Sequence, residues 1–284
     1  MVESVVWTTH LVELASYGIV AWFLWRHPDE RWPFLCLALA GFMGEESSIF
    51  LYRYYVYNTH WLIKLHWTPL AVILVWPLVI LASHHISTRL VSRPGWRRAV
   101  LTSALVLYDT AVIEPVAAAA GLWSWKTGTF FSVPLLGVGG WSIFAAAAGY
   151  TLERGWFARA PLLAVPGTTI ATQLLLGSGY TVAVATGWTS PLTHLQWTIG
   201  LSTLALLLAA LGFALRPRTA LYLDDITPKI LGACVFFALL YVFRYRYLVI
   251  WCSLVPLLYW GLAFRLRPRT RDVDERSQRL YSPR

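Results

Sequence analysis

Residues 99–120 read AVLTSALVLYDTAVIEPVAAAA, and Asp109 and Glu114 are the only charged residues in this run. A helix of about 20 predominantly apolar residues is long enough to cross the hydrocarbon core of a bilayer. A carboxylate inside such a helix is costly unless it faces a polar interior or gives up its charge. The stretch therefore predicts a membrane helix, and its two acids are candidate functional residues.

The rest of the chain has the same apolar character. Of its 284 residues, 57% are hydrophobic and only 13% are charged, and the mean hydropathy is +0.57. These values exclude an ordinary soluble domain. We predict an all-α fold, a polytopic membrane helical bundle with seven to nine transmembrane helices, because two of nine candidate stretches are short. The nine stretches are residues 10–26, 33–55, 67–86, 99–120, 139–153, 161–180, 192–215, 228–243 and 247–264.

The basic residues favour an N-out/C-in orientation. It places eleven Lys and Arg residues, Lys229 among them, in cytoplasmic loops and seven Arg residues in the tail, against five on the outer side. This bias agrees with the positive-inside rule. The first apolar run lacks the basic leader and the cleavage site of a secretory signal, so we expect it to be retained.

The predicted organisation is simple. Short connections between the stretches indicate a single transmembrane helical domain over residues 1–266. Residues 267–284 are polar and rich in charge, which predicts a disordered cytoplasmic tail. We expect an integral membrane protein, located in the cytoplasmic (inner) membrane of a prokaryote.

The net charge of +9 does not indicate nucleic acid as a partner, because the basic residues lie at loop ends beside apolar stretches. Membrane topology and the lipid bilayer explain them. Among the seven histidines only His84 and His85 are adjacent, so we predict neither a metal site nor a cofactor. Cys36, Cys234 and Cys252 are expected to be packing residues. The oligomeric state is left open.

Five acids lie within the predicted membrane helices: Glu13, Glu45, Glu46, Asp109 and Glu114. Their positions predict that they meet in one chamber in the middle-to-outer half of the bundle. At about 100° per residue, adjacent Glu45 and Glu46 point in different directions, so at most one of them faces its centre. A buried acid that stays neutral can protonate an alkene, and aromatic faces can stabilise the resulting carbocation. The alternative is that these acids only hydrogen-bond neighbouring helices.

Four motifs in the first half of the chain resemble those of the carotenoid hydratase family of membrane proteins. They are Asp109-x4-Glu114-Pro115-Val116-Ala117, Gly121-Leu122-Trp123-Ser124-Trp125, Val133-Pro134-Leu135 and Gly140-Trp141. Upstream, Glu46, the aromatic cluster at 52–57, Pro69-Leu70 and Trp76 follow in the same order, so that the resemblance covers residues 44–150. It implies a membrane enzyme that adds water to the terminal double bond of acyclic carotenoids.

Two positions depart from the family pattern. Glu114-Pro115 stands where the family has Asp-Pro, and Val138-Gly139 stands near the place of an Asn-Phe pair. Without that Asn, a candidate group for positioning water is missing, which favours capture of the cation within the substrate. Membrane terpene cyclases are similar in style.

The resulting hypothesis is an enzyme of isoprenoid or carotenoid metabolism with a lipophilic isoprenoid substrate. It protonates a terminal alkene, and hydration (a lyase) or cyclisation (an isomerase) follows. We expect Asp109 to be the proton donor, Glu46 or Glu45 its hydrogen-bonded partner, and Glu114 a second acid or the base. The expected substrate-binding residues are Tyr52, Trp76, Trp123, Trp125, Trp141 and His194. The alternative is a proton- or cation-coupled transporter in which the acids form a relay.

Overall fold

The computed structural model describes residues 2–126, 128, 130–186, 192–215, 223–243, 246–254, 257 and 259. The elements are almost all helical: α1 (Val2–Arg26), a 3-10 turn η1 (Pro28–Glu30), α2 (Arg31–Tyr52), α3 (Leu70–Leu90), α4 (Trp96–Ala119), α5 (Leu135–Glu153), α6 (Trp156–Arg159), α7 (Pro161–Thr186), α8 (His194–Leu215), α9 (Leu223–Phe243) and α10 (Arg246–Leu254). The predicted all-α bundle is confirmed. Among the described residues, five helical segments are long and apolar enough to cross a membrane, namely Pro28–Tyr52, Leu70–Leu90, Trp96–Ala119, Leu135–Glu153 and Pro161–Val182.

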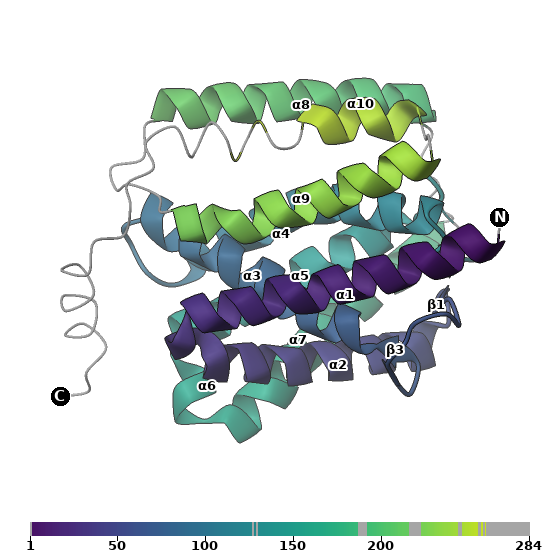
Figure 1. The fold of residues 1–284 in the computed structure, drawn as a ribbon. Coiled ribbons are helices and arrows are strands. Elements are labelled where there is room, and N and C mark those ends of the chain that lie inside the picture. Colours follow the sequence, from purple (N-terminus) through teal and green to yellow (C-terminus); the bar gives the residue numbers. More distant parts are fainter. Residues whose placement is uncertain are drawn as a thin grey trace.

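The long helices run side by side and alternate in direction (Figure 1). Helices α3 and α4 pack against each other in the middle of the bundle. Helices α2, α5 and α7 pack together on one side of this pair, whereas α1 and α9 pack on the other. Helix α10 lies between α8 and α9. The α3–α4 pair thus separates two groups of helices.

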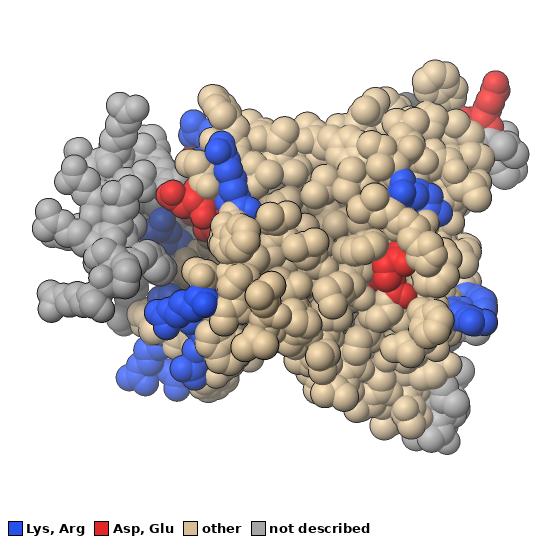
Figure 2. All heavy atoms as spheres, turned by 90° about the horizontal axis from the view of Figure 1, so that it is seen from below, with Lys and Arg blue, Asp and Glu red and all other residues tan. Residues whose placement is uncertain are grey.

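Because the helices alternate in direction, the connections gather at two ends of the bundle. Residues 26–31, 90–95 and 154–160 form what we call the basic end, which carries Arg26, Arg31, Arg93, Arg154 and Arg159. Residues 53–69, 120–126 and 130–134 form the opposite end, which we call the strand end. Lys and Arg gather toward the two ends of the face drawn in Figure 2, and most of the surface between them carries no charge. A broad uncharged surface is what a lipid-facing protein needs.

The strand end is a small structured cap. Strand β1 (Tyr55–Tyr57) pairs antiparallel with β4 (Trp123–Trp125), so that Tyr55 faces Trp125 and Tyr57 faces Trp123. A second pair, β2 (Lys64–Leu65) and β3 (Thr68–Pro69), forms a short hairpin. Helix α2 ends at Tyr52 because Arg53 has a φ of 51°, in the left-handed region. The chain therefore leaves the helix at Arg53 and crosses the end of the bundle.

Several predicted boundaries differ from the structure. The second predicted stretch continues to residue 55, whereas α2 ends at Tyr52 and gives way to β1. The fifth begins at residue 139, whereas α5 begins at Leu135, directly after Pro134. Proline has no N–H and a fixed φ, both of which suit the start of a helix. The predicted tail, residues 267–284, lies outside the described residues.

Lys229 is a clear correction. The sequence interpretation assigned it to a cytoplasmic loop, but it lies in α9 and is only 9% exposed. Its ammonium group pairs with Asp109 of α4. This partner explains how a lysine is accommodated inside the bundle, since buried charges are normally paired.

Candidate active site

Two of the five acids hold the cap and do not line a cavity. Glu13 accepts hydrogen bonds from the backbone N–H groups of Leu62 (2.7 Å) and Ile63 (3.0 Å) and from the hydroxyl of Tyr17 (2.6 Å). Its three donors satisfy a carboxylate that is completely buried. The expectation that Glu13 shares a chamber with the other acids is therefore wrong.

Glu46 has the same kind of role at the β2–β3 hairpin. Its Oε1 accepts from the hydroxyl of Thr68 at 2.7 Å and from the N–H groups of Trp67 and Thr68 at 3.1 Å. Its Oε2 lies 2.6 Å from Nδ1 of His66. The adjacent Glu45 points to the interior, as the helical rotation between neighbours requires.

Glu45 is 7% exposed and is held by two tyrosines of the cap. The hydroxyls of Tyr55 and Tyr57 donate to its Oε2 at 2.5 and 2.7 Å. Burial, together with the neighbouring Glu45, raises the pKa of both tyrosines well above the ordinary value. Both therefore stay neutral and act as hydrogen-bond donors to this carboxyl.

Glu114 is 3% exposed and lies on α4, one residue before Pro115. Its Oε2 accepts from the indole N–H of Trp123 in β4 at 2.9 Å. The Trp125 side chain approaches the same carboxyl, but its Nε1 makes no hydrogen bond of normal geometry. Strands β1 and β4 thus supply the donors for both carboxyls.

Glu45 and Glu114 line one small cavity of about 50 Å³ between α2, α4, α5, α7 and the cap. A water needs about 10–15 Å³ of such volume, so the cavity has room for a few. Its walls are aromatic on several sides, and glycines on α2 and α5 bring the backbone close. These residues are Tyr54, Tyr55, Tyr57, Trp123, Trp125, Trp141 and Phe144, and Gly41, Gly44, Gly137 and Gly140.

Gln173 of α7 also lines this cavity. Its Nε2 donates to the hydroxyls of Ser47 (2.8 Å) and Ser48 (2.9 Å) and to the carbonyl of Gly44 (3.0 Å). Its Oε1 is buried and has no hydrogen-bond partner. A buried acceptor of this kind is suited to bind a water or a substrate hydroxyl.

Asp109 belongs to a different site. It forms an ion pair with Lys229 and accepts a hydrogen bond from the hydroxyl of Tyr259. Lys229 also donates to the hydroxyl of Ser83 at 2.8 Å. Five residues of α-helix turn about 140°, so Asp109 and Glu114 point to different sides of α4. The predicted hydrogen bond between Asp109 and Glu45 or Glu46 is therefore absent among the contacts of these described residues.

Asp109, Lys229 and Tyr259 line a larger cavity of about 390 Å³ between α1, α3, α4 and α9. A tryptophan wall lies between the two cavities. The rings of Trp76 and Trp141 stack with centroids 3.8 Å apart and planes at 17°. Trp76 lines the larger cavity, Trp141 lines the smaller one, and Trp123 lines both.

The other two predicted substrate-binding residues line neither cavity. The hydroxyl of Tyr52 lies 3.4 Å from the carbonyl oxygen of Gln173, outside the cavity wall. The ring of His194 lies 5.0 Å from the ring of Phe131 at the strand end. The sequence interpretation had noted the aromatic cluster at 52–57 but had not assigned Tyr55 and Tyr57 to a carboxyl, because only the β1–β4 pairing orients them.

The model of the carotenoid biosynthesis protein family matches residues 9–209, more than two thirds of the chain. The chain belongs to the carotenoid biosynthesis protein family. Membership assigns it to carotenoid metabolism. No curated protein and no solved structure matches the chain.

The two cavities differ in how much of their lining lies within the family match. Every lining residue of the smaller cavity, from Gly41 to Leu176, lies inside the matched range. In the larger cavity, Lys229 and Tyr259 lie beyond residue 209. The carboxyl pair of this family member thus lies within the family region, whereas Asp109 takes its partners from outside it.

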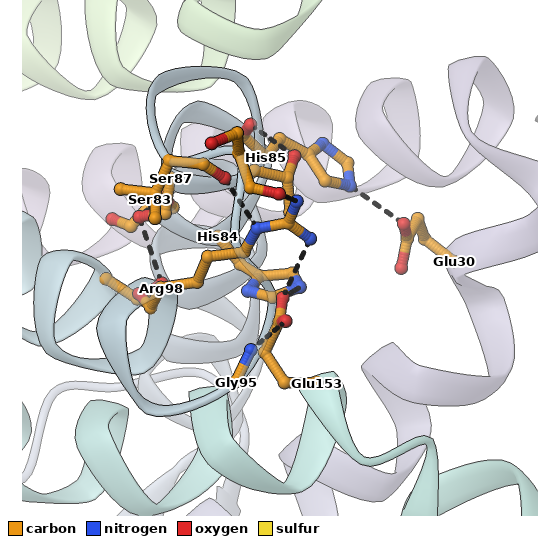
Figure 3. A network of polar contacts seen from close by, with 12 residues as sticks. Glu30, Ser83, His84, His85, Ser87, Gly95, Arg98 and Glu153 are labelled. Atoms are coloured by element: carbon orange, nitrogen blue, oxygen red, sulfur yellow. Dashed lines mark hydrogen bonds and ion pairs between the residues drawn. The ribbon is translucent and has the colours of Figure 1, made fainter.

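A third set of polar contacts lies at the basic end (Figure 3). His85 Nε2 lies 2.7 Å from Glu30 Oε1, and its Nδ1 lies 3.7 Å from Asp225 Oδ1. Glu153 lies 3.5 Å from both Arg98 and His84 and accepts from Gly95 N–H at 2.7 Å. Among the described residues, no group of three or more His, Cys, Asp or Glu side chains is placed to hold a metal ion. These contacts link η1, α3, α4, α5 and α9, and we assign them a structural role.

Proposed function

We propose that this chain is a membrane enzyme that protonates a terminal trisubstituted alkene of an acyclic isoprenoid, with Glu45 and Glu114 as the acid–base pair. One observation carries the proposal. Two buried carboxyls from different helices line one small aromatic cavity, and each is held by donors from the same strand pair. Asp109, which the sequence favoured as the acid, is less suited because it is paired with an ammonium group.

The hydrogen bonds assign a role to each carboxyl. Glu45 and Glu114 line one small cavity, where the charge on one carboxyl disfavours ionisation of the other, so we take one of the two to be protonated. Glu45 accepts from two tyrosine hydroxyls, which stabilise its ionised form, whereas Glu114 accepts from one indole. Glu114 is therefore the proposed acid and Glu45 the proposed base.

The proposed reaction balances with the substrate alone for cyclisation and with the substrate and one water for hydration. The proton of Glu114 forms a C–H bond with the less substituted alkene carbon and leaves a tertiary cation on the other carbon. The faces of Tyr54, Trp125 and Trp141 border the cavity and can stabilise that cation. A water then attacks and gives its proton to Glu45, or an internal alkene attacks and the cyclised cation loses a proton to Glu45.

Gln173 favours the hydration branch. The family resemblance implies an Asn that this chain lacks, and an amide is a suitable group for positioning water. Gln173 lines the same cavity, and its buried amide oxygen has no hydrogen-bond partner among the described residues. It can accept a hydrogen bond from a water while that water attacks the cation. Hydration therefore becomes the first product to look for, and cyclisation the second.

Mass spectrometry of lipid extracts tests the proposal. Cells that make acyclic carotenoids are compared with and without this chain. A new product heavier by one water supports hydration, and an isomer of unchanged mass with altered retention supports cyclisation. If cells that accumulate the acyclic substrate and produce this chain contain neither product, the proposed reaction is wrong.

One observation supports the transporter as a second candidate. Asp109 and Lys229 form an ion pair inside the bundle, and intramembrane ionisable pairs also occur in proton relays. This alternative predicts that Asp109→Asn abolishes a proton flux in vesicles, whereas Glu114→Gln does not. If instead Glu114→Gln abolishes turnover of the isoprenoid and Asp109→Asn does not, the result supports the enzyme.

A further inference from the structure

The larger cavity has the size and lining of a ligand site. Its volume of about 390 Å³ falls in the range of small-molecule sites. Apolar side chains such as Val12, Val72, Trp76 and Val112 dominate its walls. The smaller cavity, at about 50 Å³, is too small for the body of a long isoprenoid. The larger one is therefore the better place for an extended apolar chain.

Besides Ser16, one charged cluster interrupts these walls. Asp109, Lys229 and Tyr259 come from α4, from α9 and from the chain after α10, and meet at one point. The ammonium group of Lys229 lies 5.1 Å from the centroid of the Tyr259 ring. Ammonium and phenol hydroxyl are donors, and the carboxylate is an acceptor. The cluster therefore offers both halves of a hydrogen-bonding site to one ligand atom.

Stability alone is a weak reason for this cluster. Replacing a buried ion pair by apolar residues of similar size is often neutral or stabilising. Lys229 is 9% exposed, and apart from its partners Asp109 and Tyr259 the cavity is lined mostly by apolar side chains. An ion pair at the wall of an otherwise apolar cavity is instead the usual form of a polar anchor in a ligand site.

We propose that the larger cavity binds an apolar chain that carries a hydroxyl group, with the hydroxyl in contact with both members of the Lys229–Asp109 ion pair. The hydroxyl oxygen of the ligand accepts a hydrogen bond from the ammonium group, and the hydroxyl donates a hydrogen bond to the carboxylate. Neither an alkane nor an ether can make both contacts. This proposal rests on the proposed function in one respect only, namely that the apolar part of the ligand is an isoprenoid. It implies a substrate that is already hydroxylated, at a distance from the alkene that reacts.

A competition experiment tests this selectivity. The protein in lipid nanodiscs is given an equal mixture of phytanol and phytane, which differ only in the hydroxyl, and native mass spectrometry measures the bound ratio. A hydrogen bond to a charged group is expected to favour phytanol by about tenfold or more. The matched variant is Asp109→Leu/Lys229→Met/Tyr259→Phe, which removes the whole polar cluster and leaves none of its three members buried without a partner. Its preference should fall to that of empty nanodiscs.

Further controls keep the outcome decisive. Val75→Phe, which fills the larger cavity, should reduce the binding of both ligands. Phytanyl methyl ether should bind the wild-type protein with an affinity between those of phytanol and phytane. This comparison of three ligands needs only the wild-type protein, so it stays informative if the triple variant does not fold. Glu45→Gln should keep the wild-type ratio, which separates this site from the proposed reaction. Equal ratios in the wild type and the triple variant, or equal binding of all three ligands, would overturn the proposal.

Discussion

Glu45 and Glu46 are neighbours on α2, yet their surroundings assign them different tasks. Glu46 accepts from the backbone and side chains of the β2–β3 hairpin, and Glu45 accepts from two buried tyrosine hydroxyls. Each carboxyl is satisfied, but only that of Glu45 borders a cavity. Access to a cavity, and not depth in the bundle, distinguishes a candidate catalytic acid from a structural one.

Neutral substitutions test this distinction. Glu45→Gln and Glu114→Gln each remove a carboxyl from the small cavity, and we expect each to lower turnover by about 10²–10⁴-fold, the usual contribution of a general acid or base. Turnover is measured as product in lipid extracts, normalised to folded protein. Glu46→Gln is the matched control, because it makes the same change one residue away, and it should retain most of the turnover. Equal losses in all three variants would contradict the assignment.

Helix α5 shapes the cavity through a glycine. A Cβ at Gly137 would lie 2.6 Å from Cη2 of Trp125, closer than real contacts allow. The absence of a side chain at Gly137 lets the indole of β4 pack against α5. This contact fixes the strand pair over Glu45 and Glu114, so the helix and the cap determine the position of the carboxyl donors together.

Gly137→Ala should therefore push the Trp125 indole out of place. Overpacking of this kind typically costs about 1–3 kcal/mol of stability, and the displaced strand should also reduce turnover. Gly139→Ala, two residues further along α5, is the control because nothing lies within 4 Å of its added Cβ. It should change stability by less than about 1 kcal/mol. Thermal unfolding in detergent measures the stability of both variants, and product formation measures their turnover. A Gly137→Ala variant as stable and active as Gly139→Ala would refute the packing argument.

In the molecule as a whole, the α3–α4 pair separates two sites of different character. The small cavity holds two carboxyls with neutral donors, and the large cavity holds an ion pair in apolar surroundings. At the basic end, His, Arg and acidic side chains join the helix ends (Figure 3). The exposed middle of α7 is apolar, with Ile170 58% and Leu174 67% exposed, as lipid contact requires.

The predicted orientation can be tested by labelling. In the N-out/C-in topology the strand end lies outside and the basic end inside, by the positive-inside rule. A cysteine at the exposed Leu62 of the strand end should react with a membrane-impermeant maleimide in intact cells. A cysteine at Ser92, in the α3–α4 connection, should react only after permeabilisation. The native cysteines set the background in the unsubstituted protein. The reverse pattern would mean that the topology is inverted.

The sequence predicted the helices well because apolar length is a local property. Residues 99–120 were expected as a membrane helix, and α4 spans Trp96–Ala119. The partners of the acids are not local. Tyr55 reaches Glu45 only through the β1–β4 pairing, and Lys229 reaches Asp109 only because α9 packs on α4. The positive-inside count assigned Lys229, at the very start of the predicted stretch 228–243, to a cytoplasmic loop, and the sequence gives no sign of its distant carboxylate.

Deuterium incorporation tests the central claim most directly. In heavy water the exchangeable proton of the Glu45–Glu114 pair becomes a deuteron, and the first step transfers it to carbon, where it no longer exchanges. The product, whether hydrated or cyclised, should therefore carry one deuterium at the carbon that was protonated, located by mass spectrometry after washing with ordinary water. A product formed in heavy water without carbon-bound deuterium would contradict protonation of the alkene.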